Sequence, residues 1–145
     1  MRTTSDRIRH AVSFEVIGLL LVTPLGALAF GKPLFDIGVV GLVGATLATV
    51  WNYVYNLAFD HALQRLTGRV AKSLAIRILH AVLFEVGLIL ILVPFIAWYL
   101  AVDLVEALVM DVAFAGFYLV YAFLFNLAYD LVFPVPPARP AGRGA

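Results

Sequence analysis

The sequence contains no cysteine among its 145 residues, which excludes disulfides, thiolate nucleophiles and cysteine-ligated metal sites. Charged residues are also scarce, at 13%, whereas 63% of the residues are hydrophobic and the mean hydropathy is +1.01. Soluble domains are roughly 45–50% apolar, so this composition indicates an integral membrane protein. The net charge of +1 provides no basic surface for nucleic acid, and we expect no nucleic-acid partner.

Four apolar runs are each long enough to span a bilayer, since about 20 helical residues cross a hydrocarbon core of roughly 30 Å. The helices are expected at about residues 9–30, 37–59, 79–101 and 107–132. The residues between Asp60 and Arg77 are more polar and predict the main hydrophilic loop. Residues 134–145 are rich in proline and glycine and predict a disordered tail. The predicted fold is an all-α membrane protein with four transmembrane helices.

The chain is an internal duplication with an offset of 70 residues. Segment 7–16 recurs as segment 77–86 with eight of ten positions identical, and Pro24 recurs as Pro94 inside the third apolar run. Each repeat contains an even number of spans, so both repeats have the same orientation and form a parallel repeat. The first hairpin is assigned to residues 1–70 and the second to residues 71–133.

The basic residues fall almost entirely on one side of the predicted membrane. Nine of the ten share that side, and only Lys32 is opposite. The nine are Arg2, Arg7, Arg9, Arg65, Arg69, Lys72, Arg77, Arg139 and Arg143. Asp36, Asp103, Glu106 and Asp111 are assigned to the other side. Because basic residues concentrate in cytoplasmic loops, we expect both termini and the central loop to be cytoplasmic.

Two glutamates lie inside apolar runs at equivalent positions of the repeats, Glu15 and Glu85. Each is six residues, or about 9 Å, beyond the expected membrane edge, where desolvation favours a neutral carboxyl group. A carboxylate there can hold a proton or an organic cation but not both, which is the minimal mechanism for exchanging one against the other. The alternative is a protonated Glu15 that hydrogen-bonds Asn52 or another neighbour as a helix–helix contact. We favour Glu15 over Glu85 because Asn52 has Ala122 as its counterpart.

Polar and aromatic residues near the ends of the second and fourth spans are candidate substrate ligands. Asn52, Asn56 and Asp60 are spaced four residues apart and therefore share one face of a helix. Hydrogen bonding between helices explains this stripe equally well, and the interfacial aromatic belt explains most of the nearby rings. The candidate substrate-binding residues are Phe14, Trp51, Asn52, Tyr55, Asn56, Asp60, Asn126 and Asp130.

Two histidines, His10 and His80, precede the glutamates by about one and a half turns. An imidazole there could pass protons to the glutamates, although packing or helix capping is an equally simple role. Isolated histidines in separate helices do not make a metal site, and none is expected. No serine–histidine or paired-aspartate arrangement lies at membrane depth, so we expect no enzyme activity.

A row of glycines opens the second span, at Gly38, Gly41 and Gly44. Such a row lets another helix approach closely. Four helices also enclose little volume. These two observations predict a homodimer or larger assembly whose interface contributes to the pathway.

Four motifs in order resemble those of the proteobacterial antimicrobial compound efflux family. They are R-x-x-H-A-x-x-F-E at 7–15 and again at 77–85, W-N-x-x-Y-N-x-x-F-D at 51–60, and Y-x-x-x-F-N-x-x-Y-D at 121–130. The resemblance covers about residues 7–130. It implies a small multidrug efflux protein of the bacterial inner membrane that exports cations such as chlorhexidine or short-chain diamines. It also implies that Glu15 is the carboxylate linked to proton coupling and substrate binding.

The leading hypothesis is therefore an antiporter that uses the proton gradient, and no cofactor, to export a small cationic substrate. Glu15 would be the exchange carboxylate and Glu85 a second site. The alternative is a membrane module that transports nothing and stabilises a partner complex, with the glutamates as hydrogen-bonding groups between helices.

Overall fold

The computed structural model describes residues 3–68 and 73–134 of the chain. This part folds into four helices and contains no strand. The helices are α1 (Thr4–Phe30), α2 (Leu34–Thr67), α3 (Leu74–Leu100) and α4 (Leu104–Val132). All four are long and apolar enough to cross a membrane. The predicted all-α fold with four spans is confirmed, and the chain is a multi-pass membrane protein.

The helices extend further than the apolar runs that predicted them. The side chains of Thr3 and Ser73 accept hydrogen bonds from Asp6 N and Ile76 N, and so cap α1 and α3 several residues before the apolar runs begin. At the other end, α2 continues to Thr67. The main loop predicted between Asp60 and Arg77 is therefore wrong in extent. Hydropathy marks only where a helix is apolar, whereas its backbone hydrogen bonds continue through polar residues.

Several predictions fall on residues outside the described ranges. They concern the disordered tail, of which residues 135–145 are not described, and five of the nine basic residues that set the expected orientation. Those five are Arg2, Arg69, Lys72, Arg139 and Arg143.

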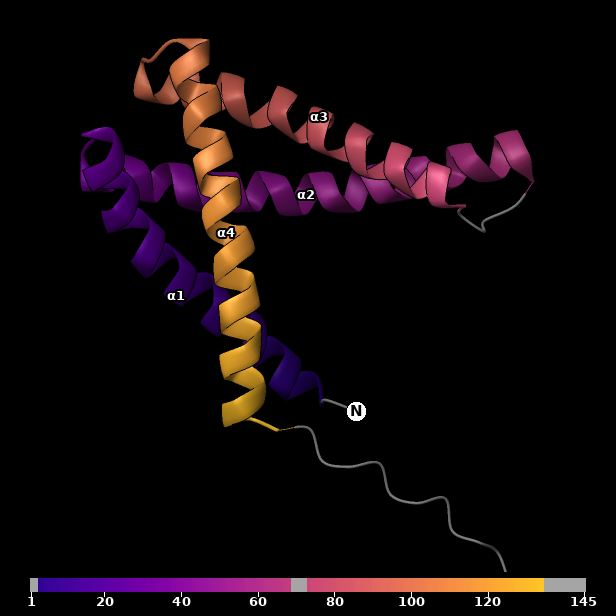
Figure 1. The fold of residues 1–145 in the computed structure, drawn as a ribbon, viewed down its shortest axis with the longest axis horizontal. Helices are drawn as coiled ribbons and strands as arrows, with labels where there is room; N and C mark the ends of the chain where they lie inside the picture. Colours follow the sequence, from indigo (N-terminus) through magenta and orange to yellow (C-terminus); the bar gives the residue numbers. More distant parts are fainter. Residues whose placement is uncertain (1–2, 69–72, 135–145) are drawn as a thin grey trace, which may run out of the picture.

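The helices form two arms that diverge from one vertex (Figure 1). One arm contains α1 and α4, the other contains α2 and α3, and both hairpin turns lie at the vertex. Each helix packs on two neighbours: α1 on α2 and α4, and α3 on α2 and α4. Within the described residues, neither α1 and α3 nor α2 and α4 pack on each other. The four helices therefore surround a central space.

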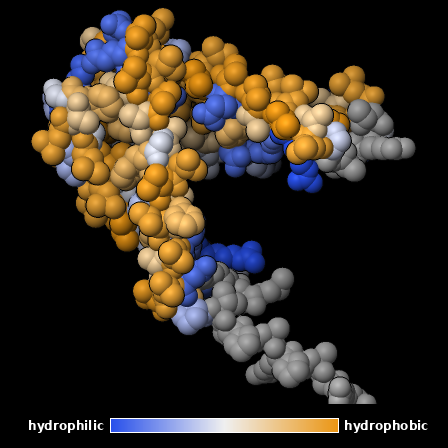
Figure 2. Space-filling model, in the orientation of Figure 1, coloured by the Kyte–Doolittle hydropathy of each residue, from blue (hydrophilic) through white to orange (hydrophobic). Residues whose placement is uncertain are grey.

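The outer surface of both arms is mostly hydrophobic (Figure 2). Large apolar side chains are exposed on both helices of one arm, for example Leu20 and Leu28 on α1 and Leu119 on α4. In a soluble protein such a surface would be unfavourable, but lipid chains satisfy it.

The vertex is closed by a hydrophobic core. The buried residues of this core come from α2, α3 and α4, and they are Ile37, Val40, Val93, Ile96, Ala107 and Met110. Polar contacts lie beside it: Lys32 Nζ is 3.0 Å from Glu106 Oε1, and the Tyr99 hydroxyl donates to Asp36 Oδ1 at 3.5 Å. The end of the molecule with the hairpin turns is thus sealed, while the arms separate toward the other end.

Equivalent residues of the two repeats make equivalent contacts with the opposite repeat. Trp51 Nε1 donates to the carbonyl oxygen of Phe84 at 3.0 Å. Its counterpart at an offset of 70, Tyr121, donates its hydroxyl to the carbonyl oxygen of Phe14 at 2.7 Å. Each arm is therefore built from one helix of each repeat.

Gly87 provides the space for the Trp51 ring in the arm formed by α2 and α3. A Cβ atom at Gly87 would overlap this ring, with Trp51 Cη2 only 2.8 Å away. We expect Gly87→Ala to lower the stability of the protein by about 1–3 kcal/mol, the usual effect of overpacking. Thermal unfolding in detergent measures this. Gly116→Ala is the matched control, because its Cβ would meet nothing within 4 Å; equal unfolding temperatures for the two variants would contradict the prediction.

The glycine row of α2 packs inside the chain. A Cβ at Gly38 would lie 3.5 Å from Thr23, and a Cβ at Gly41 would lie 3.0 Å from Leu19, both residues of α1. At Gly44 a Cβ would meet nothing within 4 Å. The close helix approach predicted for this row is confirmed at its first two glycines, between α2 and α1. The row therefore gives no support to the homodimer, which stays a prediction.

Candidate functional site

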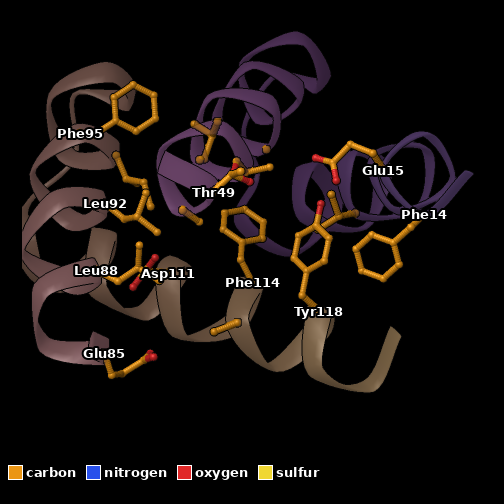
Figure 3. Close-up of a pocket in the computed structure, with 18 residues that line it drawn as sticks. Phe14, Glu15, Thr49, Glu85, Leu88, Leu92, Phe95, Asp111, Phe114 and Tyr118 are labelled. Carbon is orange, nitrogen blue, oxygen red and sulfur yellow. The ribbon is translucent and has the colours of Figure 1, made fainter. Parts of the chain in front are cut away.

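A cavity of about 320 Å³ lies between the helices and receives side chains from all four of them (Figure 3). Most of its wall is apolar, with residues such as Val22, Leu88, Leu92, Phe95 and Phe114. Since a water molecule occupies about 30 Å³ of liquid, the volume corresponds to roughly ten waters. The cavity is therefore large enough for a small organic molecule.

Three carboxyl groups line this apolar wall: Glu15 on α1, Glu85 on α3 and Asp111 on α4. Asp111 is only 8% exposed, Glu15 is half-buried and Glu85 is exposed. Within residues 3–68 and 73–134, none of the three makes a hydrogen bond or an ion pair. No lysine or arginine of the described ranges lines the cavity. A buried carboxylate without a partner is costly, so Asp111 and the half-buried Glu15 require a proton or a cation.

Tyr118 adds a polar group next to Glu15. Its hydroxyl oxygen is buried and has no hydrogen-bond partner among the residues that the structure describes. Figure 3 shows the hydroxyl directed toward the same space as the Glu15 carboxyl group, with which it interacts electrostatically. Buried hydroxyls normally have a partner, and a tyrosine hydroxyl can both donate and accept. Tyr118 therefore adds a buried, unsatisfied hydroxyl next to Glu15 in the described part of the chain.

The three carboxyl groups do not form a metal site. In the described part of the chain, no group of three or more His, Cys, Asp or Glu side chains is arranged to hold a metal ion. The acids line one cavity but are spread over its wall. This distribution suits separate positive groups on one ligand better than a single ion.

The structure brings only some of the predicted site residues to the cavity. Glu15, Glu85 and Phe14 line it. The other candidate substrate-binding residues are absent from its wall, namely Trp51, Asn52, Tyr55, Asn56, Asp60, Asn126 and Asp130. They lie on α2 and α4, further along the arms, and their role in substrate binding stays a prediction.

The predicted polar stripe of α2 makes contacts within the arm formed by α2 and α3. Asn56 Nδ2 donates to the carbonyl oxygen of Asn52 at 2.7 Å and to Asn52 Oδ1 at 2.8 Å. Tyr55 donates its hydroxyl to the carbonyl oxygen of His80 at 2.8 Å. The pairing of Glu15 with Asn52, considered as the alternative role of Glu15, is not found.

The two histidines join the repeats through asparagines. His10 Nε2 is 2.8 Å from Asn126 Oδ1, and His80 Nε2 is 3.1 Å from Asn56 Oδ1. Each ring also packs edge-on against an aromatic ring of the other repeat. The centroid of His10 is 4.6 Å from that of Tyr129, and the centroid of His80 is 4.5 Å from that of Phe59. These contacts support a packing role, while proton access through the histidines stays a prediction.

Sequence reasoning missed two residues of the cavity, Asp111 and Tyr118. Asp111 was considered only among the acids opposite the basic residues, yet it is seven residues inside α4, or about 10 Å beyond its first residue, and lines the cavity. The sequence did contain one signal for these two residues, because the two repeats differ at both positions. At an offset of 70, Asp111 corresponds to Gly41 and Tyr118 to Ala48.

Comparisons with known proteins agree with a transport role. A family model described as "Chlorhexidine efflux transporter" matches residues 2–65 and, a second time, residues 72–135. A short-chain diamines transporter of Vibrio parahaemolyticus is 43% identical over 137 residues, which cover 94% of this chain and 96% of that protein. A protein of the same name from Acinetobacter baylyi is 33% identical, with coverage of 91% and 92%. No solved structure matches the chain.

Proposed function

The chain belongs to the chlorhexidine efflux transporter family, and from this membership we propose that it exports short-chain diamines across the bacterial inner membrane in exchange for protons. Two matches of the family model, one to each repeat, support the membership. The names of the curated relatives support diamines as the substrate class.

One observation carries the proposal, namely unpaired carboxyl groups in a largely apolar cavity. A diamine has two ammonium groups joined by methylenes, and it matches acids separated by apolar wall. Each acid is neutral when it holds a proton and is neutralised when it binds an ammonium group. Because the two states exclude each other at one carboxyl group, proton binding at Glu15 releases the substrate, and substrate binding releases the proton.

The shape of the molecule supports one half of a transport cycle. The vertex is closed by Ile37, Met110 and the Lys32–Glu106 ion pair, and the arms separate toward the termini. With the termini in the cytoplasm, as the distribution of basic residues predicts, the cavity faces the side from which an exporter loads its substrate. Release on the other side requires the vertex to open.

The alternative, a membrane module that stabilises a partner complex, requires Glu15 and Glu85 to hydrogen-bond other helices. In the described part of the chain, neither glutamate makes such a bond. Both instead border the cavity. In the transport proposal, the position of both glutamates at the cavity lets them contact the substrate.

Proteoliposomes test the proposal. With an acidic interior, outward proton movement should drive uptake of radiolabelled 1,5-diaminopentane at several times the rate of protein-free liposomes, which account for passive trapping of amines. Dissipating the pH gradient with an ionophore should abolish the difference. If neither the diamine nor chlorhexidine moves in a protein-dependent way, the proposed function is wrong.

A further inference from the structure

We propose that Asp111 is the second cation-binding residue of the cavity, so that a short α,ω-diamine places one ammonium group at Glu15 and the other at Asp111. This inference rests on the proposed function and deepens it, because it explains why the site would prefer diamines to monoamines. Membership of the chlorhexidine efflux transporter family does not by itself assign this role to Asp111.

Asp111 is the most buried of the three acids. Its side chain is 8% exposed, makes no hydrogen bond or ion pair in the described part of the chain, and points into the cavity between Leu88 and Phe114 (Figure 3). Among residues 3–68 and 73–134, no lysine or arginine lines the cavity, so this part of the chain offers Asp111 no cation. A cation from outside would provide what this carboxyl group lacks.

The polar groups of the cavity form two separate stations. At one, Tyr118 lies next to Glu15, and its hydroxyl is buried without a partner among the described residues. The other is formed by Asp111 of α4 and Glu85 of α3, which both line the cavity. Apolar side chains, among them Phe114, lie between the stations. The proposal places one ammonium group at each station and the methylene chain against the apolar wall between them.

Burial decides between Asp111 and Glu85 at the second station. Glu85 is exposed, so the protein does not enclose its carboxyl group around a ligand. Asp111 is shielded from water and gains more from an incoming ammonium group, because charge-assisted hydrogen bonds are strong where water is excluded. Asp111 is therefore the residue that discriminates against a ligand with only one charge.

The repeat supports a specialised role for this residue. The position equivalent to Asp111 in the first repeat is Gly41, which also borders the cavity. The glutamate at position 15 of the first repeat has an equivalent at position 85 of the second. The acid at position 111, in contrast, occurs only in the second repeat. The second station thus belongs to one half of the cavity.

Calorimetry on the purified full-length protein tests the assignment with two probes of equal length, 1,5-diaminopentane and 1-aminopentane. We expect wild type to bind the diamine about 10- to 100-fold more tightly, the range for one additional hydrogen bond to a charged group. Asp111→Asn should remove this preference for the diamine. Glu15→Gln should weaken both ligands. Asp36→Asn, which alters an acid outside the cavity, should change neither.

A variant that conserves the charge extends the test and remains informative if Asp111→Asn fails to fold. Asp111→Glu moves the carboxyl group by one methylene into the cavity and should shift the preferred ligand toward 1,4-diaminobutane. If wild type binds neither amine, the proposed function and this inference both fail. If wild type prefers the diamine and Asp111→Asn keeps that preference, or if Asp111→Glu leaves the preferred length unchanged, only the assignment of Asp111 is wrong.

Discussion

Glu15→Gln is expected to reduce diamine transport driven by a pH gradient to the level of protein-free liposomes. Glutamine has nearly the same shape as glutamate, so the packing of the half-buried side chain against α4 is preserved. The glutamine amide cannot bind and release a proton near neutral pH, and it cannot neutralise an ammonium group. Both halves of the exchange are lost together. Uptake of radiolabelled 1,5-diaminopentane into proteoliposomes with an acidic interior measures the effect.

Glu85→Gln is the matched control, since it makes the same chemical change at the equivalent position of the second repeat. Glu85 is exposed and Asp111 lies beside it, so we expect transport to fall by no more than a few-fold. Wild-type transport by Glu15→Gln would show that Glu15 is not the exchange carboxylate. Complete loss in both variants would show instead that the two glutamates act as an equivalent pair.

Linking the two sides of the vertex is expected to stop transport while preserving substrate binding. Lys32 and Glu106 form an ion pair at 3.0 Å that joins the first hairpin turn to the start of α4. Because the chain has no native cysteine, Lys32→Cys/Glu106→Cys can be linked selectively by a short, reducible bis-methanethiosulfonate reagent. If release requires the vertex to open, the linked protein should transport at background level, and reductant should restore transport.

The unlinked double variant should transport nearly as well as wild type, since an ion pair of this kind contributes only about 0–1 kcal/mol. Each single-cysteine variant treated with the same reagent serves as a control for the modification itself. Binding of 1,5-diaminopentane should persist in the linked protein, because the arms remain open at their free ends. Full transport by the linked protein would show that substrate leaves without a separation of the vertex.

The sequence was sufficient to predict the helices but insufficient to predict how they pair. Apolar runs of more than 20 residues have few alternatives to a transmembrane helix, so the four spans followed directly. Helix pairing depends on contacts between distant residues, such as Trp51 with Phe84 and Tyr121 with Phe14. No local pattern encodes those contacts. Asn52 was therefore expected near Glu15, whereas it bonds Asn56 on its own helix.

The candidate site was predicted in part for a similar reason. Glu15 and Glu85 stood out because the same acid occurs twice inside apolar runs, and both line the cavity. Asp111 stood near the start of its span and resembled an interfacial residue by position alone. Its burial depends on Leu88 of α3 and Phe114 of α4, which the fold brings around it. A position where the two repeats differ was the remaining signal.

The exchange of helices between the repeats has a consequence for gene duplication. A single ancestral hairpin could make the contacts of Trp51 and Tyr121 only with a second copy of itself, as a homodimer. In such a homodimer both copies carry every substitution. An acid at the position of Asp111 would therefore also be present at the equivalent position, now Gly41, in the other half of the cavity. Joining both hairpins in one chain removes that constraint. One half of the cavity can then carry Asp111 while the other keeps Gly41 and its close contact with α1.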